Sequence, residues 1–178
     1  AKEFYEEQKR ENPDKDMSNA LCRYALVEIV NLHSPALEFE AIHRIVTDVD
    51  TKALMSEMTA ALELSEEKAE QAIVVCDNGT EKTLYIHKPT SKLTVGSLQN
   101  FLDSYIKEKG GKVDYIHGAD VIRELASKPD SIGFMLPDMG KEELFPTVIV
   151  DGALPRKTFS MGHAEDKRFY VEARKILK

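Results

Sequence analysis

Residues 154–163, LPRKTFSMGH, contain the side chains of this chain that are best suited to hold an anion. Adjacent guanidinium and ammonium groups, followed by hydroxyls, can surround a phosphate or a carboxylate with charge-assisted hydrogen bonds. The run does not have the spacing of a standard phosphate loop, so an ordinary basic turn remains the alternative to a functional loop. The binding residues expected here are Arg156, Lys157, Thr158, Ser160 and His163.

A second candidate pair, His43 and Arg44, lies in the apolar stretch EAIHRIV, whose alternation predicts a strand. The alternation places His43 with Ile45 on one face and Arg44 on the other. The histidine is either a partly buried structural residue or an acid/base group. A buried guanidinium needs an anionic partner, which could be a carboxylate of the protein or the phosphate of a ligand.

The stretch YIHGAD, residues 115–120, places His117 at the end of an expected strand and Asp120 at the start of an expected helix. Ligands often bind beyond the carboxyl ends of strands in open sheets. The alternative is a simple strand–turn–helix connection, with Gly118 as the bend and Asp120 near the helix cap. The catalytic candidates are therefore His43, His117 and Asp120.

Composition narrows the classes of partner. The net charge of −7 argues against binding to nucleic acid, because phosphate contacts need a basic surface. No window approaches the roughly 18 apolar residues that cross a bilayer, and no signal peptide is visible. Cys22 and Cys76 lie in apolar runs, which predicts buried thiols and a cytoplasmic protein. The five histidines show no metal-binding spacing, so no metal site is predicted.

Hydrophobic periodicity predicts a mixed α+β fold in a single domain over residues 1–178. The clearest element is a β-hairpin at about residues 72–87, because Asn78-Gly79 is a typical type I′ turn. Other strands are expected at residues 22–32, 40–46, 112–117 and 131–136. Helices are expected from the start of the chain to Pro13, at 50–64, from 98 to Gly110-Gly111, at 119–127 and at 163–177, with a helical turn at 141–145.

Several of these segments together resemble a known family. ALVEIVNLHSPALEFEAIHRIV, VDYIHGADVIRELA, SIGFMLP and LFPTVIVDGALPRKTFSMGHAEDKRFYVEARKI are similar to the C-terminal half of the uncharacterised family called domain of unknown function 1015. The opening AKEFYEEQK looks like the helix that follows the family motif GDGNHSLA. The resemblance therefore implies that this chain is the C-terminal part of a longer protein.

The family is similar in outline to the ParB/sulfiredoxin-like superfamily, which includes nucleotide-dependent kinases that act on free serine. This resemblance implies a phosphotransferase lobe that uses ATP or ADP with Mg, in which Arg44, Arg156 and Lys157 neutralise phosphate. His117 or His43 would be the acid/base group. Lys157 and Thr158 are the best-supported family positions, since Arg156 replaces a proline. The alternative is a non-catalytic module that binds an anionic metabolite or a protein partner; a small anionic ligand or nucleotide is expected, without nucleic acid or membrane.

Overall fold

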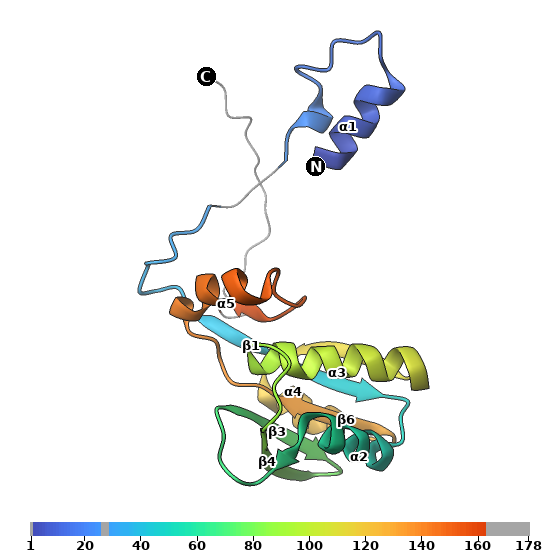
Figure 1. Ribbon diagram of the computed structural model, residues 1–178, viewed down its shortest axis with the longest axis vertical. Helices are drawn as coiled ribbons and strands as arrows, with labels where there is room; N and C mark the ends of the chain where they lie inside the picture. Colours follow the sequence, from blue (N-terminus) through green and yellow to red (C-terminus); the bar gives the residue numbers. More distant parts are fainter. Residues whose placement is uncertain (1, 26–28, 163–178) are drawn as a thin grey trace. The chain divides into compact units, whose positions relative to one another are not determined.

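The computed structural model describes residues 2–25 and 29–162, and contacts divide them into two units. Among the described residues, the smaller unit comprises those up to Leu32, with helix α1 (Lys2–Glu11) and the 3-10 helix η1 (Leu21–Arg23). The larger unit begins at His33 and contains every strand that is described (Figure 1).

The strand expected over residues 22–32 is wrong for the described part of that run. Its first residues belong to η1, and residues 24–25 and 29–32 form no strand. Leu21 and Ile29 are largely exposed, and Cys22 is partly buried rather than a core thiol. An apolar, β-branched sequence is stable as a strand only where neighbouring residues pack against it and pair with it. None of the described ladders includes this run.

The larger unit confirms the α+β class, with seven strands in one antiparallel sheet. Six strands follow the order β2-β4-β3-β6-β1-β5, and β7 pairs with the first part of β1. Their bounds are β1 (Phe39–Thr47), β2 (Leu64–Ser65), β3 (Gln71–Asp77), β4 (Thr80–Ile86), β5 (Lys112–His117), β6 (Ser131–Met135) and β7 (Phe159–Met161).

The expected hairpin is confirmed as β3 and β4. Asn78 and Gly79 join these strands with φ values of 46° and 76°, the two positive angles that a type I′ turn needs. The helices that follow the sheet strands are α2 (Thr51–Leu62), α3 (Thr94–Lys109), α4 (Ala119–Ala126), η2 (Lys141–Glu143) and α5 (Leu144–Asp151). The helical turn expected at 141–145 thus continues as α5.

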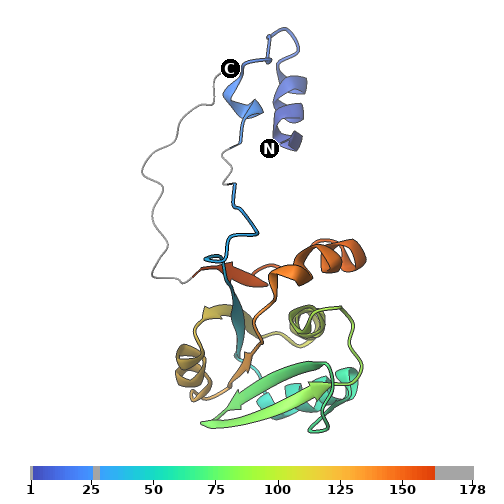
Figure 2. The ribbon, with the colours of Figure 1, turned by 90° about the vertical axis from the view of Figure 1, so that its left-hand side faces the viewer.

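The two faces of the sheet are covered by different helices (Figure 2). Arg44 of β1 points toward α3, where it contacts Gln99. On the opposite face Gly133 of β6 lies under α4, since an added Cβ would be only 2.6 Å from Cγ2 of Ile122. His43 alternates with Arg44 and therefore lies on the α4 side, as the sequence pattern predicts.

Strand β7 was not predicted from the sequence. It aligns Met161 with Phe39 and Ser160 with Glu40, and the rings of Phe159 and Phe39 stack with centroids 4.0 Å apart. This pairing fixes the C-terminal side of the basic run to the first part of β1. The helix expected at 163–177 lies outside the described residues, as does His163.

Candidate functional site

Arg44 is fully buried beneath the basic run, with none of its surface exposed. Its Nε donates to Oε1 of Gln99 at 2.8 Å, and Nη1 donates to the Ile42 carbonyl at 2.6 Å. Nη2 donates to the Arg156 carbonyl at 3.2 Å, and the guanidinium carbon lies 4.6 Å from the centre of the Tyr115 ring. The guanidinium therefore ties the backbone of the basic run to α3 and to the sheet.

Within the described residues, Arg44 does not contact a carboxylate directly; the side-chain amide of Gln99 lies between it and Asp103. Gln99 accepts from Arg44 and donates to Oδ1 of Asp103 at 2.7 Å. Burial lowers the pKa of Arg44 to about 10, while Tyr115 and Asp103 oppose that shift. The group remains protonated at neutral pH. A direct contact between Arg44 and a phosphate stays a prediction.

The basic run itself forms a tight turn with its two cations outward. Lys157 has a φ of 57°, in the left-handed region, and both Arg156 and Lys157 are exposed. Thr158 is buried, and its hydroxyl donates to the Pro155 carbonyl at 2.7 Å across the turn. Ser160 is buried in β7, where its hydroxyl donates to a backbone carbonyl two residues on. We call residues 155–158 the basic loop; its one hydroxyl, that of Thr158, bonds to the loop backbone, and its two charged residues are exposed.

His117 forms a second feature, a hydrogen-bonded pair with Glu40. Nε2 of His117 contacts Oε2 of Glu40, and the two side chains are 26% and 23% exposed. The pair follows from the register, because His117 lies opposite Ile42 and therefore on the same face of the sheet as Glu40. A half-buried imidazole oriented by a carboxylate is an arrangement suited to proton transfer.

His43 is arranged differently. Its Nδ1 accepts a hydrogen bond from the Leu136 backbone N–H at 3.2 Å. Burial lowers the pKa of His43, and the nearby Asp138 only partly opposes this effect. His43 lies opposite Ile116 in the ladder, so its side chain and that of His117 leave opposite faces of the sheet. The structure does not bring the two histidines into one acid/base pair.

Asp120, in the first turn of α4, has a side chain that is 99% exposed. Its carboxylate accepts from Nη1 of Arg123 at 2.7 Å, and Nε of Arg123 donates to Glu81 at 2.6 Å. The backbone follows the alternative expected for YIHGAD: Gly118, with φ 94°, is the bend between β5 and α4, and Asp120 lies close to the helix start, where no side chain caps α4. The structure shows Asp120 bound to Arg123 and not to His117.

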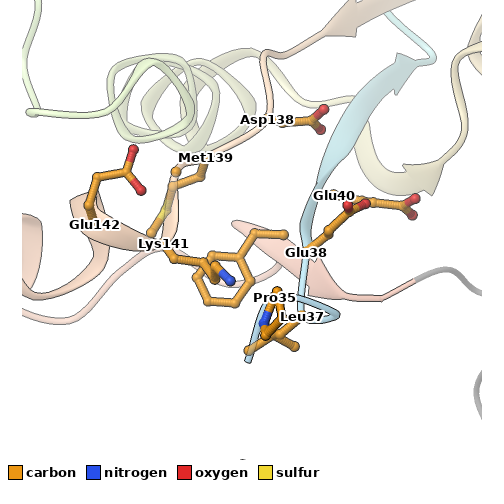
Figure 3. A pocket seen from close by; sticks show the side chains of 10 residues that line it. Pro35, Leu37, Glu38, Glu40, Asp138, Met139, Lys141 and Glu142 are labelled. Carbon is orange, nitrogen blue, oxygen red and sulfur yellow. The ribbon is translucent and has the colours of Figure 1, made fainter. Parts of the chain in front are cut away.

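Two pockets share Asp138 and Met139 as lining residues. The larger, which we call the β1 pocket, has a volume of about 470 Å³ (Figure 3). The smaller, the α3 pocket, has a volume of about 230 Å³ and includes Thr158 of the basic loop. The β1 pocket is lined mainly by Pro35, Leu37, Glu38, Phe39, Glu40, Asp138, Lys141 and Glu142. The α3 pocket is lined mainly by Glu70, Gln71, Lys92, Thr94, Val95, Asp138, Glu143 and Thr158.

Two polar side chains of the β1 pocket, those of Asp138 and Lys141, are bound to protein backbone. Oδ1 of Asp138 accepts from the Ala41 backbone N–H at 2.7 Å. Nζ of Lys141 donates to the Ser34 carbonyl at 2.7 Å. Figure 3 shows Asp138 and Lys141 on one side of β1 and the side chain of Glu40 extending to the other side. Among the described residues, no group of three or more His, Cys, Asp or Glu is arranged to hold a metal ion.

Three residues of this region were not predicted from the sequence: Glu40, Gln99 and Asp138. Glu40 lies 77 positions from His117, and only the strand register brings the two together. The sequence did contain one indication of Glu40: it is the first residue of EAIHRIV, and alternation places it on the same face of the strand as Arg44. Gln99 carries no sequence signal of its own, since it lies among the buried positions of an ordinary amphipathic helix.

Residues 1–105, more than half of the chain, match the family described as "Protein of unknown function (DUF1015)". The chain belongs to this family. The match confirms the family resemblance, although it ends within α3 and does not reach the basic loop. The comparison with curated protein sequences found no match. None of the described helices is long and apolar enough to cross a membrane.

Solved structures share the fold. A conserved hypothetical protein from Pyrococcus furiosus has a TM-score of 0.59 at 15% identity, covering 77% of this chain and 61% of its own. Free serine kinase in complex with ADP gives 0.57 at 16% identity, with 76% and 58% covered. SbnI from Staphylococcus aureus gives 0.52 at 12% identity, with 74% and 53% covered. This chain thus spans about three fifths of the first two structures, and these identities concern the fold alone.

Proposed function

We propose that this chain is a lobe of a nucleotide-dependent phosphotransferase that acts on a small substrate. The fold is similar to that of a kinase solved with ADP and with AMP. The observation that carries the proposal is the basic loop, where two exposed cations stand on a turn that Arg44 holds from beneath.

The basic loop is suited to phosphate because its backbone is held in place beneath two exposed cations. Phosphoryl transfer depends mainly on positioning and on neutralising the charge of the phosphate oxygens. Arg156 and Lys157 supply this charge. Arg44 and Thr158 fix the backbone between them through the Arg156 and Pro155 carbonyls. In this proposal Arg44 is a positioning residue, and the exposed side chains make the phosphate contacts.

His117 is the better acid/base candidate of the two histidines. Its ring is half-buried and oriented by Glu40, so it is placed to accept a proton from a substrate hydroxyl. Nδ1 of His43 is already bonded to a backbone N–H, and burial keeps that ring neutral by lowering its pKa. Asp120 is assigned no role, because Arg123 binds its carboxylate.

A nucleotide would supply the phosphoryl group, with its phosphates at Arg156 and Lys157. The described residues offer no cluster fitted to Mg, so no step is assigned to that ion. The non-catalytic alternative, an anionic-metabolite module, uses the same loop without His117. Replacement of His117 by Gln therefore separates the two: turnover is lost in the enzyme, while ligand binding persists in both cases.

The test of the phosphate assignment is calorimetry with ADP. Lys157→Ala should weaken ADP binding by about 1.5–3 kcal/mol, or roughly 10- to 150-fold, because a charge-assisted contact is removed. Lys68→Ala, at another exposed position, is the matched control and should leave the affinity unchanged. Equal affinity of the Lys157 variant and the unmodified protein would defeat the assignment.

A further inference from the structure

The outward side of helix α5 is apolar, which is unusual for a helix on a protein surface. At about 100° per residue, one side of the helix, within about 140°, carries Phe145, Pro146, Ile149 and Val150. All four residues are exposed, and Phe145, Ile149 and Val150 are 63%, 82% and 70% exposed. No polar side chain of α5 falls within this range of angles. We call these four residues the α5 apolar side.

The polar residues of α5 lie on the opposite side of the helix, toward the rest of the larger unit. Thr147 is buried. Oδ2 of Asp151 accepts from the Ser91 hydroxyl and from the Lys92 backbone N–H, both at 2.7 Å. These contacts fix the rotation of α5 about its axis and leave the α5 apolar side turned outward. A surface helix normally has the reverse arrangement, so this side is suited to contact with another molecule.

Opposite charges lie before and after the α5 apolar side along the chain. Glu142 and Glu143, both exposed, precede α5 in η2. Lys141, the one cation of η2, donates to a backbone carbonyl. Beyond the end of α5, the basic loop carries the exposed cations Arg156 and Lys157. The segment is therefore acidic before the helix and basic after it.

We infer that the α5 apolar side binds the α5 apolar side of a second copy of this chain, with the two helices antiparallel. A two-fold axis places each apolar side against its identical counterpart. The same axis brings the acidic start of each helix toward the basic loop of the other copy and opposes the two helix dipoles. This charge complementarity favours a second copy over a membrane surface, because exposed carboxylates beside the helix are repelled by anionic lipid headgroups.

Sedimentation velocity across a concentration series of the full chain tests the association. The unmodified protein should convert from monomer to dimer as its concentration rises. Ile149→Asp places a carboxylate on the α5 apolar side and should weaken the dimer about 10-fold or more. Val121→Asp, at an exposed apolar position of α4, is the matched control and should leave the association unchanged. A protein that stays monomeric at every concentration would overturn the inference, as would equal association of the Ile149 variant and the unmodified protein.

Charge reversals test the antiparallel arrangement and the identity of the partner. In a two-fold dimer, Glu142→Arg alone and Arg156→Glu alone each bring like charges together twice. Each variant should therefore weaken self-association about 3- to 10-fold. An equimolar mixture of the two variants should associate as the unmodified protein does, because opposite charges then meet at both contacts. Weak association that persists in the mixture would contradict the antiparallel pairing.

The inference goes beyond the proposed function and does not depend on it, since no nucleotide is present in these measurements. All four substituted positions are exposed, and circular dichroism should show that each variant keeps its fold. A dimer that does not bind ADP would defeat only the phosphotransferase proposal. ADP binding by a protein that stays monomeric would defeat only this inference.

Discussion

Arg44 and Gln71 are two buried polar side chains in the same unit, and they are satisfied to very different degrees. Arg44 is fully buried, and each of its three nitrogens donates to a protein acceptor. Gln71 is 6% exposed, and its oxygen has no partner among the described residues. Burial alone therefore does not distinguish a structural group from a binding group. The pairing of each group separates them further: Arg44 is bonded to the backbone of the basic loop, whereas the Gln71 oxygen is left unpaired in the described part of the chain.

The free energies of unfolding of variants test the contrast between Arg44 and Gln71, and the largest loss is expected at Arg44. Arg44→Met should lower the free energy of unfolding by about 3–5 kcal/mol, because it leaves buried acceptors without their donor. Gln71→Met should cost less than about 1.5 kcal/mol, since the lost hydrogen bonds are offset by removal of an unpaired oxygen. Urea denaturation measures both values. Equal losses would show that the two groups are structural to the same degree.

Arg123→Met serves as a surface control for the Arg44 variant. Arg123 makes two ion pairs, with Glu81 and Asp120, on a side chain that is 46% exposed. Exposed pairs contribute little, so the expected loss is below about 1 kcal/mol. A loss as large as that of Arg44→Met would mean that charge removal, and not the buried pairing, explains the effect.

A smaller effect is expected at His43, a third buried polar group and one that is paired like Arg44. Its folded-state pKa lies below the ordinary value of 6.5 because burial disfavours the charged ring. The unfolded chain therefore binds more protons below about pH 6.5, and His43 makes stability fall as the pH drops through that range. His43→Asn keeps an acceptor for the Leu136 N–H. It should flatten the decline in melting temperature between about pH 6.5 and 5; an unchanged slope would exclude His43 as its source.

The sequence contains most of the information for the larger unit. Alternation in EAIHRIV places His43 and Arg44 on opposite faces, and Asn78-Gly79 defines the hairpin, as the structure confirms. These features are local, because each follows from neighbouring side chains and backbone angles. Strand β7 has only three residues, and its position depends on pairing with β1 more than 110 residues earlier. A pattern within such a short segment cannot specify that partner.

The candidate site was less predictable for the same reason. The basic loop can be recognised from Arg156 and Lys157 alone, whereas the support that Arg44 gives it spans 112 positions. The sequence does not indicate that Oε1 of Gln71 is unpaired, because only the fold shows which end of the side-chain amide is hydrogen-bonded. The wrong strand at 22–32 shows the converse, because an apolar run formed no strand in its described part.

Amide chemical shifts measured by NMR during an ADP titration test the central claim most directly. If the basic loop holds the nucleotide phosphates, the largest shift changes should occur at Arg156, Lys157 and Thr158. The hairpin turn at Asn78 and Gly79 should stay unchanged. Changes confined to residues outside 155–158, or no saturable change at all, would contradict the account.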